Sequence, residues 1–203
     1  MGMVTKIQEL SKSRSKVYID GEFSFVLYHG ELRHYGIEEG SEIEESTRKE
    51  ILQTILPKRA KLRCMNLLKS REYTEKQLRN KLQQGFYPEA VVDEAIQYVK
   101  SFRYVDDQRY AESYIAYHLA DKSRQRIRMD LVRKGISKEM VEKLLVETEG
   151  TGEEEKEQIK RLLYKKRYSV DMDLKEKQKI YGYLLRKGYR NDDIQQVMRI
   201  VQF

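Results

Sequence analysis

Apolar residues recur at helical spacing through most of the chain, from about residue 44 to the end. Three of these amphipathic runs end alike, at residues 81–86 (KLQQGF), 131–136 (LVRKGI) and 184–189 (LLRKGY). In each run a glycine precedes a bulky apolar residue, and the three glycines lie 50 and 53 residues apart. Glycine in this place is typical of a helix C-terminus at which a left-handed residue satisfies the last carbonyls. The pattern therefore predicts one helix–glycine–helix unit used three times.

Helix start signals complete each unit. Thr74 and Gln77 form a capping-box pattern, Ser137 is placed to cap a helix, and the Asp106–Asp107 pair is typical of an acidic first turn. Together with the amphipathic run before each of them, these signals predict three repeats of three helices. The predicted bounds are 58–105, 106–149 and 150–203.

The first 57 residues follow a different pattern. Asp20–Gly21 lies between β-branched and aromatic residues, which is typical of a two-residue type I′ hairpin. Residues 4–10 are a candidate third strand, and residues 28–35 a short helix. Two or three strands alone are marginally stable, so we expect this module to pack against another part of the protein. The prediction for 1–57 is a small β-hairpin module and a connecting helix, which Pro57 should interrupt.

The complete prediction is a mainly α protein with an N-terminal β-hairpin module. Tandem repeats of this kind form an elongated, curved array in which each repeat contacts mainly its neighbours. A compact globule is the alternative. Residues 149–155 (EGTGEEE) are acidic, contain two glycines and lack apolar side chains. They predict a linker, which favours an array with a flexible joint over a compact globule.

Composition narrows the possible compartments and sites. No run approaches the roughly 20 apolar residues that span a bilayer, and the N-terminus lacks the apolar core of a signal peptide. We therefore expect a cytoplasmic protein without membrane association. Cys64 is the single cysteine, so an internal disulfide is impossible. Its position on an apolar helix face predicts a small core residue.

Charge is distributed unevenly around a net value of +7. Residues 157–203 hold 12 basic and 6 acidic side chains, and residues 122–138 hold seven basic side chains with Asp130 as the one acid. A basic face on a repeat scaffold predicts a polyanionic partner. A solvated Lys/Arg face is the alternative.

The candidate binding residues lie on or just after the second helix of each repeat. Arg124 and Arg128 share a face at i, i+4, and Arg126 and Arg133, seven residues apart, lie near one face. Arginine forks suit phosphate and carboxylate partners. A solvated side chain is the alternative for any one residue, whereas recurrence in three repeats favours binding by the set. The full set is Arg124, Arg126, Arg128, Arg133, Lys134, Arg186, Lys187, Arg190, Arg79 and Lys81.

Tyrosine is abundant, with 15 residues against no tryptophan. Tyr104, Tyr110, Tyr114 and Tyr117 surround the junction of the first and second repeats. Tyrosines can stack on bases or anchor interfaces. Core packing with the hydroxyl at the surface is the interpretation that we favour.

Catalytic motifs are lacking. The sequence has no phosphate-binding glycine loop and no nucleophile elbow. His29, His34 and His118 have no second type of metal ligand at a suitable spacing. We therefore expect a protein that is not an enzyme and holds no cofactor and no metal.

Four stretches along the chain resemble the RecX family, the bacterial regulators of the RecA recombinase. Residues 104–111 (YVDDQRYA) resemble the junction between the family's first and second repeats, and 74–86, 124–136 and 179–189 resemble the helices of its three repeats. The resemblance covers about 59–203. The β-rich N-terminal part is similar to an extension on some longer members, and some members run past the third repeat.

The resemblance implies a non-enzymatic regulator that binds RecA–DNA filaments along their groove. It would modulate, mostly by inhibition, the recombinase, ATPase and co-protease activities that serve recombination, repair and the SOS response. It also implies weak, sequence-independent binding of single- and double-stranded DNA, and we expect a monomer. The alternative is a helix-turn-helix protein that reads a specific DNA sequence in the major groove. The second helices carry few Asn or Gln, and their basic residues suit phosphates better than base edges.

Overall fold

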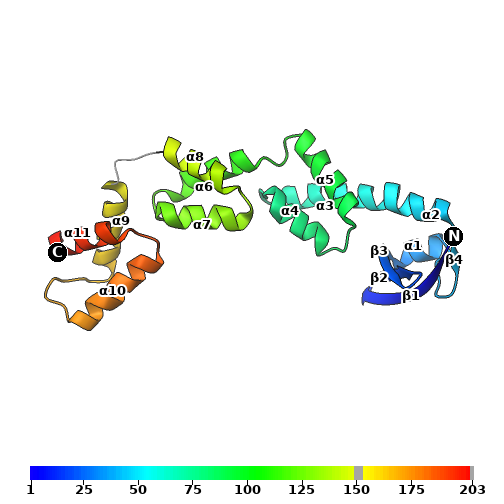
Figure 1. The fold of residues 1–203 in the computed structure, drawn as a ribbon, viewed down its shortest axis with the longest axis horizontal. Helices are drawn as coiled ribbons and strands as arrows, with labels where there is room; N and C mark the ends of the chain where they lie inside the picture. Colours follow the sequence, from blue (N-terminus) through cyan, green and yellow to red (C-terminus); the bar gives the residue numbers. More distant parts are fainter. Residues whose placement is uncertain (149–152, 202–203) are drawn as a thin grey trace. The chain divides into compact units, whose positions relative to one another are not determined.

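The computed structural model describes residues 1–148 and 153–201. The chain divides into two compact units, Met1–Asp106 and Asp107–Phe203, which we describe separately. Helices predominate, and a small antiparallel sheet lies near the N-terminus, as predicted (Figure 1). Within the described ranges, no helix is both long and apolar enough to cross a membrane.

The N-terminal module is a four-stranded sheet in the order β3-β2-β1-β4. The predicted hairpin is confirmed, because Asp20 and Gly21 adopt positive φ angles of 52° and 86° between β2 and β3. The segment around Ser41 leads into a fourth strand, β4, which the sequence pattern did not indicate. Its backbone covers the edge of β1: Val4 N donates to Ser41 O at 2.9 Å, and Gly40 N donates to Val4 O at 2.8 Å. The strands are β1 (Gly2–Ser11), β2 (Arg14–Ile19), β3 (Glu22–Tyr28) and β4 (Glu42–Ile43).

A continuous helix connects the sheet to the first repeat. The predicted short helix comes first as α1 (His29–His34), and then α2 (Glu45–Glu50), the π-helical turn η1 (Ile51–Ile55) and α3 (Leu56–Leu68) follow one another without a break. The expected interruption at Pro57 was wrong. Leu56 N donates to Ile51 O, five residues back, and this wider turn makes room for the proline ring. Pro57 itself is buried in the first turn of α3.

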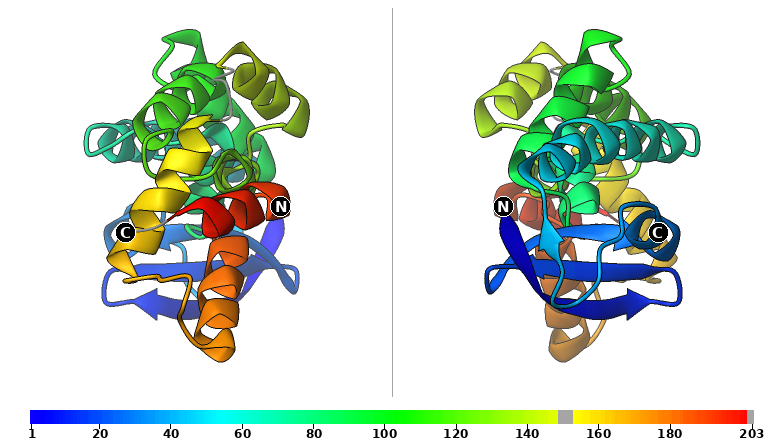
Figure 2. Two further views of the ribbon diagram at one scale, coloured as in Figure 1. Left: turned by 90° about the vertical axis from the view of Figure 1, so that its left-hand side faces the viewer. Right: turned by 90° about the vertical axis from the view of Figure 1, so that its right-hand side faces the viewer.

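The sheet and the first repeat share one hydrophobic core. Thr74 and Gln77 form the predicted capping box at the start of α4 (Glu75–Gln83), and α5 (Glu89–Ser101) follows. Figures 1 and 2 show the strands beside the cyan helix of α2 and α3. As expected, the module packs on a partner, and burial against these helices stabilises a sheet that would be marginal alone. Members of this core from both parts include Val17, Phe25, Leu27, Ile51, Leu56, Leu78, Leu82 and Ile96.

The second compact unit contains two three-helix repeats, each with its own core. The second repeat comprises α6 (Asp107–His118), α7 (Arg124–Lys134) and α8 (Lys138–Glu147) around Ile115, Ile127 and Leu131. The third repeat comprises α9 (Glu153–Lys165), α10 (Leu174–Arg186) and α11 (Asn191–Ile200) around Ile159, Leu163 and Leu184.

The predicted linker is helical at its C-terminal end. Residues 149–152 lie outside the described residues, but Glu153, Glu154 and Glu155 form the first turn of α9 rather than a linker. Acidic side chains are stabilising at a helix N-terminus because they face the positive end of the helix dipole.

The helix ends agree with the glycine pattern in two repeats and differ in one. Gly135 and Gly188 are left-handed, with φ of 103° and 89°. In the first repeat the left-handed residue is Phe86, with φ of 62°, so the prediction for Gly85 was wrong. A Cβ at Gly85 would lie 2.9 Å from the Tyr87 ring, and hence this glycine permits a close approach instead.

Backbone hydrogen bonds at the end of the second helix show which residues of the three repeats are equivalent. Tyr87 N donates to Leu82 O at 3.4 Å, as Ile136 N does to Leu131 O at 3.1 Å and Tyr189 N to Leu184 O at 3.3 Å. Phe86, Gly135 and Gly188 are therefore equivalent. Counting back from them, Arg79 corresponds to Arg128, and Lys81 corresponds to Asp130 and Tyr183.

Candidate nucleic-acid and filament interface

Arg79 and Arg128 make equivalent ion pairs within their repeats. Arg79 Nη1 donates to Asp93 Oδ1 at 2.5 Å, and Arg128 Nε and Nη2 donate to the two carboxylate oxygens of Glu142 at 2.6 and 2.9 Å. The hydrogen bond from Arg128 lowers the pKa of Glu142, and the one to Asp93 raises the pKa of Arg79. Each arginine thus connects the second helix of its repeat to the third helix of the same repeat. Their guanidinium groups are occupied by carboxylates of the same repeat.

Arg124 is also engaged inside the protein. Its guanidinium donates to Leu145 O at 2.9 Å and to Thr148 O at 2.6 Å, so it satisfies carbonyls at the end of α8. Its backbone N–H donates to Glu155 Oε1 at 2.6 Å. Such hydrogen bonds at helix ends stabilise the repeat.

One groove in the second compact unit, of about 840 Å³, brings Arg124, Arg128 and Arg190 together. The same groove is lined by one further cation, Lys156, and by four carboxylates. Because four cations face four carboxylates, the groove has no excess charge to attract an anion. The carboxylates belong to Glu142, Glu154, Glu155 and Asp193.

The other face of α7 carries a different arrangement around Asp130, a buried residue with 5% of its surface exposed. Arg133 Nη2 donates to its Oδ1 at 3.0 Å, and Arg126 Nε lies 3.4 Å from the same oxygen. Tyr114 Oη and Lys122 Nζ donate to Oδ2 at 3.0 and 3.2 Å. The predicted shared face of Arg126 and Arg133 is thus confirmed, since both reach one oxygen atom.

The charge state of Asp130 follows from these contacts. Burial alone would raise the pKa of the carboxyl, but the hydrogen bonds from Lys122 and Tyr114 outweigh it and leave the pKa below its ordinary value. Burial alone would lower the pKa of Lys122, but the hydrogen bonds of its ammonium to Tyr114 and Asp130 outweigh this effect and raise the pKa. The carboxylate and the ammonium are both charged at neutral pH.

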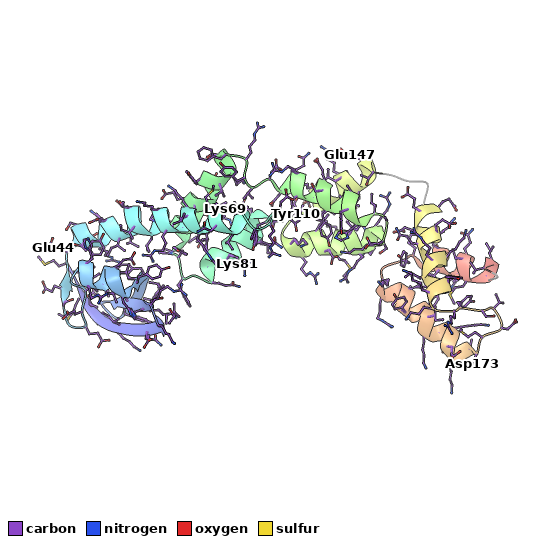
Figure 3. The ribbon with its side chains drawn as sticks, turned by 180° about the vertical axis from the view of Figure 1, so that it is seen from behind. Glu44, Lys69, Lys81, Tyr110, Glu147 and Asp173 are labelled. Atoms are coloured by element: carbon purple, nitrogen blue, oxygen red, sulfur yellow. The ribbon has the colours of Figure 1, made fainter. Side chains whose placement is uncertain are left out.

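Aromatic rings adjoin this site. Tyr110, labelled in Figure 3, and Tyr114 stack with ring centroids 6.3 Å apart on α6. Lys134 Nζ lies 5.6 and 5.3 Å from the two ring centroids, within the range of a cation–π contact. We call Lys122, Arg126, Asp130, Arg133 and Lys134 the Asp130 cluster. Three of its cations, Lys122, Arg126 and Arg133, contact its single carboxylate, which leaves an excess of positive charge.

The other predicted residues are exposed at separate places. Lys81 lies on α4 (labelled in Figure 3), in the first compact unit. Arg186, Lys187 and Arg190 are exposed around the end of α10 in the third repeat. Lys187 Nζ lies 5.6 Å from the Tyr183 ring centroid.

Core packing is found for two of the four tyrosines, although the hydroxyl of Tyr114 donates to the buried Asp130 instead of lying at the surface. Tyr110 and Tyr114 are partly buried against the core of the second repeat. Tyr104 and Tyr117 are 47% and 79% exposed. Tyr104 stacks on Phe102 with centroids 5.7 Å apart, an exposed pair that the sequence pattern did not indicate.

Sequence reasoning omitted Lys122, Asp130 and Tyr114 from the candidate site. The available signal was Asp130 itself, the one acid in a basic stretch. Cys64 is buried as predicted, and burial raises the pKa of its thiol to about 11. Among the described residues, no group of three or more histidine, cysteine or acidic side chains could hold a metal ion.

Comparisons with known proteins match every repeat. Sequence models described as the first, second and third three-helix domains of RecX match residues 60–98, 106–145 and 147–198. The chain belongs to the RecX family. The resemblance inferred from its sequence is confirmed.

Individual RecX proteins are similar over nearly the whole chain. "Regulatory protein RecX" of Caldanaerobacter subterraneus subsp. tengcongensis is 33% identical over 200 residues, which cover 98% of this chain and 99% of that protein. The protein of the same name from Clostridium acetobutylicum is 29% identical and covers 97% of this chain and 94% of its own length. These relatives are named as regulatory proteins.

Two crystal structures of RecX proteins have a similar fold. A structure of a regulatory protein RecX, 25% identical, aligns with a TM-score of 0.63 over 97% of this chain and 98% of its own. RecX from Lactobacillus salivarius, 27% identical, aligns with a TM-score of 0.60 over 71% of this chain and 96% of its own.

Proposed function

We propose that this RecX protein binds RecA filaments on DNA and restrains their recombinase, ATPase and co-protease activities. Membership of the RecX family carries the proposal, because all three helical domains match in order and the relatives are named regulatory proteins. The proposed role is non-enzymatic, and the proposed active form is a monomer in the cytoplasm.

The modular construction suits a repetitive partner. The second and third repeats have separate cores, and the first shares its core with the sheet, so three surfaces are available in one chain. Covalently linked modules that bind neighbouring protomers gain affinity from their high effective concentration. A protein that joins protomers would oppose the rearrangements that ATP turnover requires, and inhibition would follow without any chemistry.

We further propose a division of labour among the predicted basic residues. Arg79, Arg124 and Arg128 stabilise their repeats through internal carboxylates and carbonyls. The phosphate contacts of DNA are proposed for the Asp130 cluster, for Lys81, and for the exposed Arg186 and Lys187 at the end of α10. Arg190 lines the charge-balanced groove with Arg124 and Arg128 and is left out of this set. These contacts touch backbone phosphates, so they give affinity without sequence preference.

Two measurements test the proposal. Co-sedimentation with RecA filaments on single-stranded DNA should recover the protein with the filament, and RecA on its own without DNA serves as the control. The binding constant for labelled random-sequence DNA, measured by fluorescence anisotropy, should fall as salt is added. A plot of its logarithm against the logarithm of the salt concentration should steepen by about 0.7–0.9 for each phosphate contact. Absence of the protein from the filament pellet would contradict the filament proposal.

The same DNA experiment separates the alternative function. A sequence-specific helix-turn-helix protein binds its site at least about a thousandfold more tightly than random DNA. Selection from a randomised duplex library should therefore yield no enriched sequence. A strongly enriched motif would show that the second helices read bases, and would contradict the phosphate-only contacts proposed here.

A further inference from the structure

We propose that Asp130 is a positioning residue for DNA binding: its buried carboxylate holds Lys122, Arg126 and Arg133 in place to bind backbone phosphates. This inference rests on the proposed DNA binding of the protein. It adds Lys122 to the binding residues, and it gives an acidic residue a favourable part in binding a polyanion.

Saturation of the carboxylate is the first observation. Asp130 is 5% exposed, and each of its two oxygens meets two groups, the arginines on Oδ1 and the tyrosine and lysine on Oδ2. A buried carboxylate without partners is strongly destabilising, so the surrounding cations are constrained to remain close to it. The carboxylate therefore acts as a fixed anchor from which they extend.

The unused donors are the second observation. Arginine has five N–H donors, and Arg126 approaches Asp130 with its Nε while Arg133 uses one Nη2 hydrogen. The side chains of Arg126 and Arg133 are 42% and 73% exposed, so their other donors reach solvent. Each guanidinium can bind the anchor and a phosphate at the same time, because its donors form a planar fork.

The local charge balance is the third observation. Three cations, Lys122, Arg126 and Arg133, surround one carboxylate in the Asp130 cluster, whereas cations and carboxylates balance in the groove on the other face of α7. An anion approaching α7 is therefore attracted to the face that carries Asp130. Closely spaced cations suit DNA, whose phosphates are themselves closely spaced.

The arrangement is particular to the second repeat. The residues equivalent to Asp130 are Lys81 in the first repeat and Tyr183 in the third, so neither offers an acidic anchor. Lys122 is likewise replaced by the buried Tyr73 in the first repeat. The second repeat is thus expected to contribute the best-ordered phosphate site.

The test compares two substitutions that raise the net charge equally. Asp130→Asn removes the anchor, and Glu139→Gln removes an exposed acid on α8 of the same repeat. If net charge decided affinity, both variants would bind DNA more tightly than the natural protein. Loss of two ordered arginine side chains instead predicts that Asp130→Asn binds about tenfold more weakly. Glu139→Gln should bind equally or slightly more tightly.

The assay is the anisotropy of a fluorescein-labelled oligothymidylate titrated with the full chain at low salt. Hydrogen exchange of α6–α8 reports whether the second repeat stays folded in each variant. Should Asp130→Asn unfold it, Tyr114→Phe replaces that variant, because it removes one donor to Asp130 and keeps the ring. Tyr114→Phe is expected to weaken binding about threefold, as for one looser side chain.

A double substitution distinguishes positioning from a general structural role. In a background of Arg126→Ala and Arg133→Ala, Asp130→Asn should weaken binding much less than in the natural protein, since only Lys122 is then still held by Asp130. A full additive loss in that background would overturn the inference.

Three other results are decisive. If the natural protein binds no oligothymidylate, the proposed DNA binding itself is wrong, and the inference falls with it. If the natural protein binds and a folded Asp130→Asn variant binds equally or more tightly, only the inference is wrong. If Asp130→Asn weakens filament association but leaves DNA binding unchanged, the cluster binds an acidic protein surface, which also overturns the inference.

Discussion

Arg124 and Arg133 lie on the same helix, and we predict opposite consequences when each is replaced by alanine. Arg124 donates to two carbonyl oxygens at the end of α8, and a hydrogen bond from a charged donor contributes about 1.5–3 kcal/mol. Since Arg124 is only partly buried, Arg124→Ala should lower the stability of the second repeat by about 3 kcal/mol, the bottom of the range that the two bonds sum to.

Arg133 has a smaller structural part. Its side chain is 73% exposed and makes one contact, at 3.0 Å to Asp130, which keeps other partners when Arg133 is removed. An exposed pair of this kind contributes about 0–1 kcal/mol. Arg133→Ala should therefore leave the stability of the repeat nearly unchanged. Loss of one phosphate contact should make the slope of log DNA-binding constant against log salt concentration shallower by about 0.7–0.9.

The two quantities need separate measurements. Because the chain contains two compact units, a single unfolding curve need not be two-state. Hydrogen exchange of peptides from α6–α8 reports the opening free energy of the second repeat directly. Anisotropy at several salt concentrations gives the DNA slope. The reasoning is refuted if Arg124→Ala lowers the slope with unchanged exchange protection while Arg133→Ala destabilises the repeat.

Three further predictions concern the fold. Cys64, buried and with its pKa raised to about 11, should resist iodoacetamide at pH 8 until the first compact unit unfolds; rapid labelling of the native protein would contradict this. Gly135→Ala should destabilise the second repeat by about 1–2 kcal/mol because φ is 103°, whereas Gly182→Ala, inside α10, should stabilise the third by about 0.5–1 kcal/mol in exchange measurements. Because the pKa of Asp130 is lowered on folding, its stabilisation is complete above about pH 4 and is lost as the pH falls further. Exchange protection of α6–α8 should therefore fall below pH 4, and less so in Asp130→Asn.

Local signals predicted most of the fold because their causes are local. The Asp20–Gly21 turn needs two positive φ angles, and the Thr74–Gln77 box joins residues three apart, so each pattern contains its own physical cause. The failure at Pro57 arose from a non-local cause. The shared core favours a continuous helix, and a π-helical turn accommodates the proline.

The candidate site was less accessible to sequence reasoning, because the partners of a side chain depend on packing between helices. Arg128 and Arg133 look alike in the sequence. The structure pairs Arg128 with Glu142 on α8, and leaves most of Arg133 exposed. Counting basic residues located α7 correctly as the most basic helix, but it could not show that one face is neutralised and that Asp130 organises the other.

The central claim, regulation of RecA, is tested most directly by titrating the full chain into the DNA-dependent ATPase reaction of RecA. Inhibition should appear below equimolar protein, because one bound chain joins neighbouring protomers of the filament. Arg126→Ala/Arg133→Ala should shift the inhibition curve to higher concentration while the α6–α8 exchange protection is retained. An unchanged ATPase rate at protein concentrations equal to that of RecA would contradict the account.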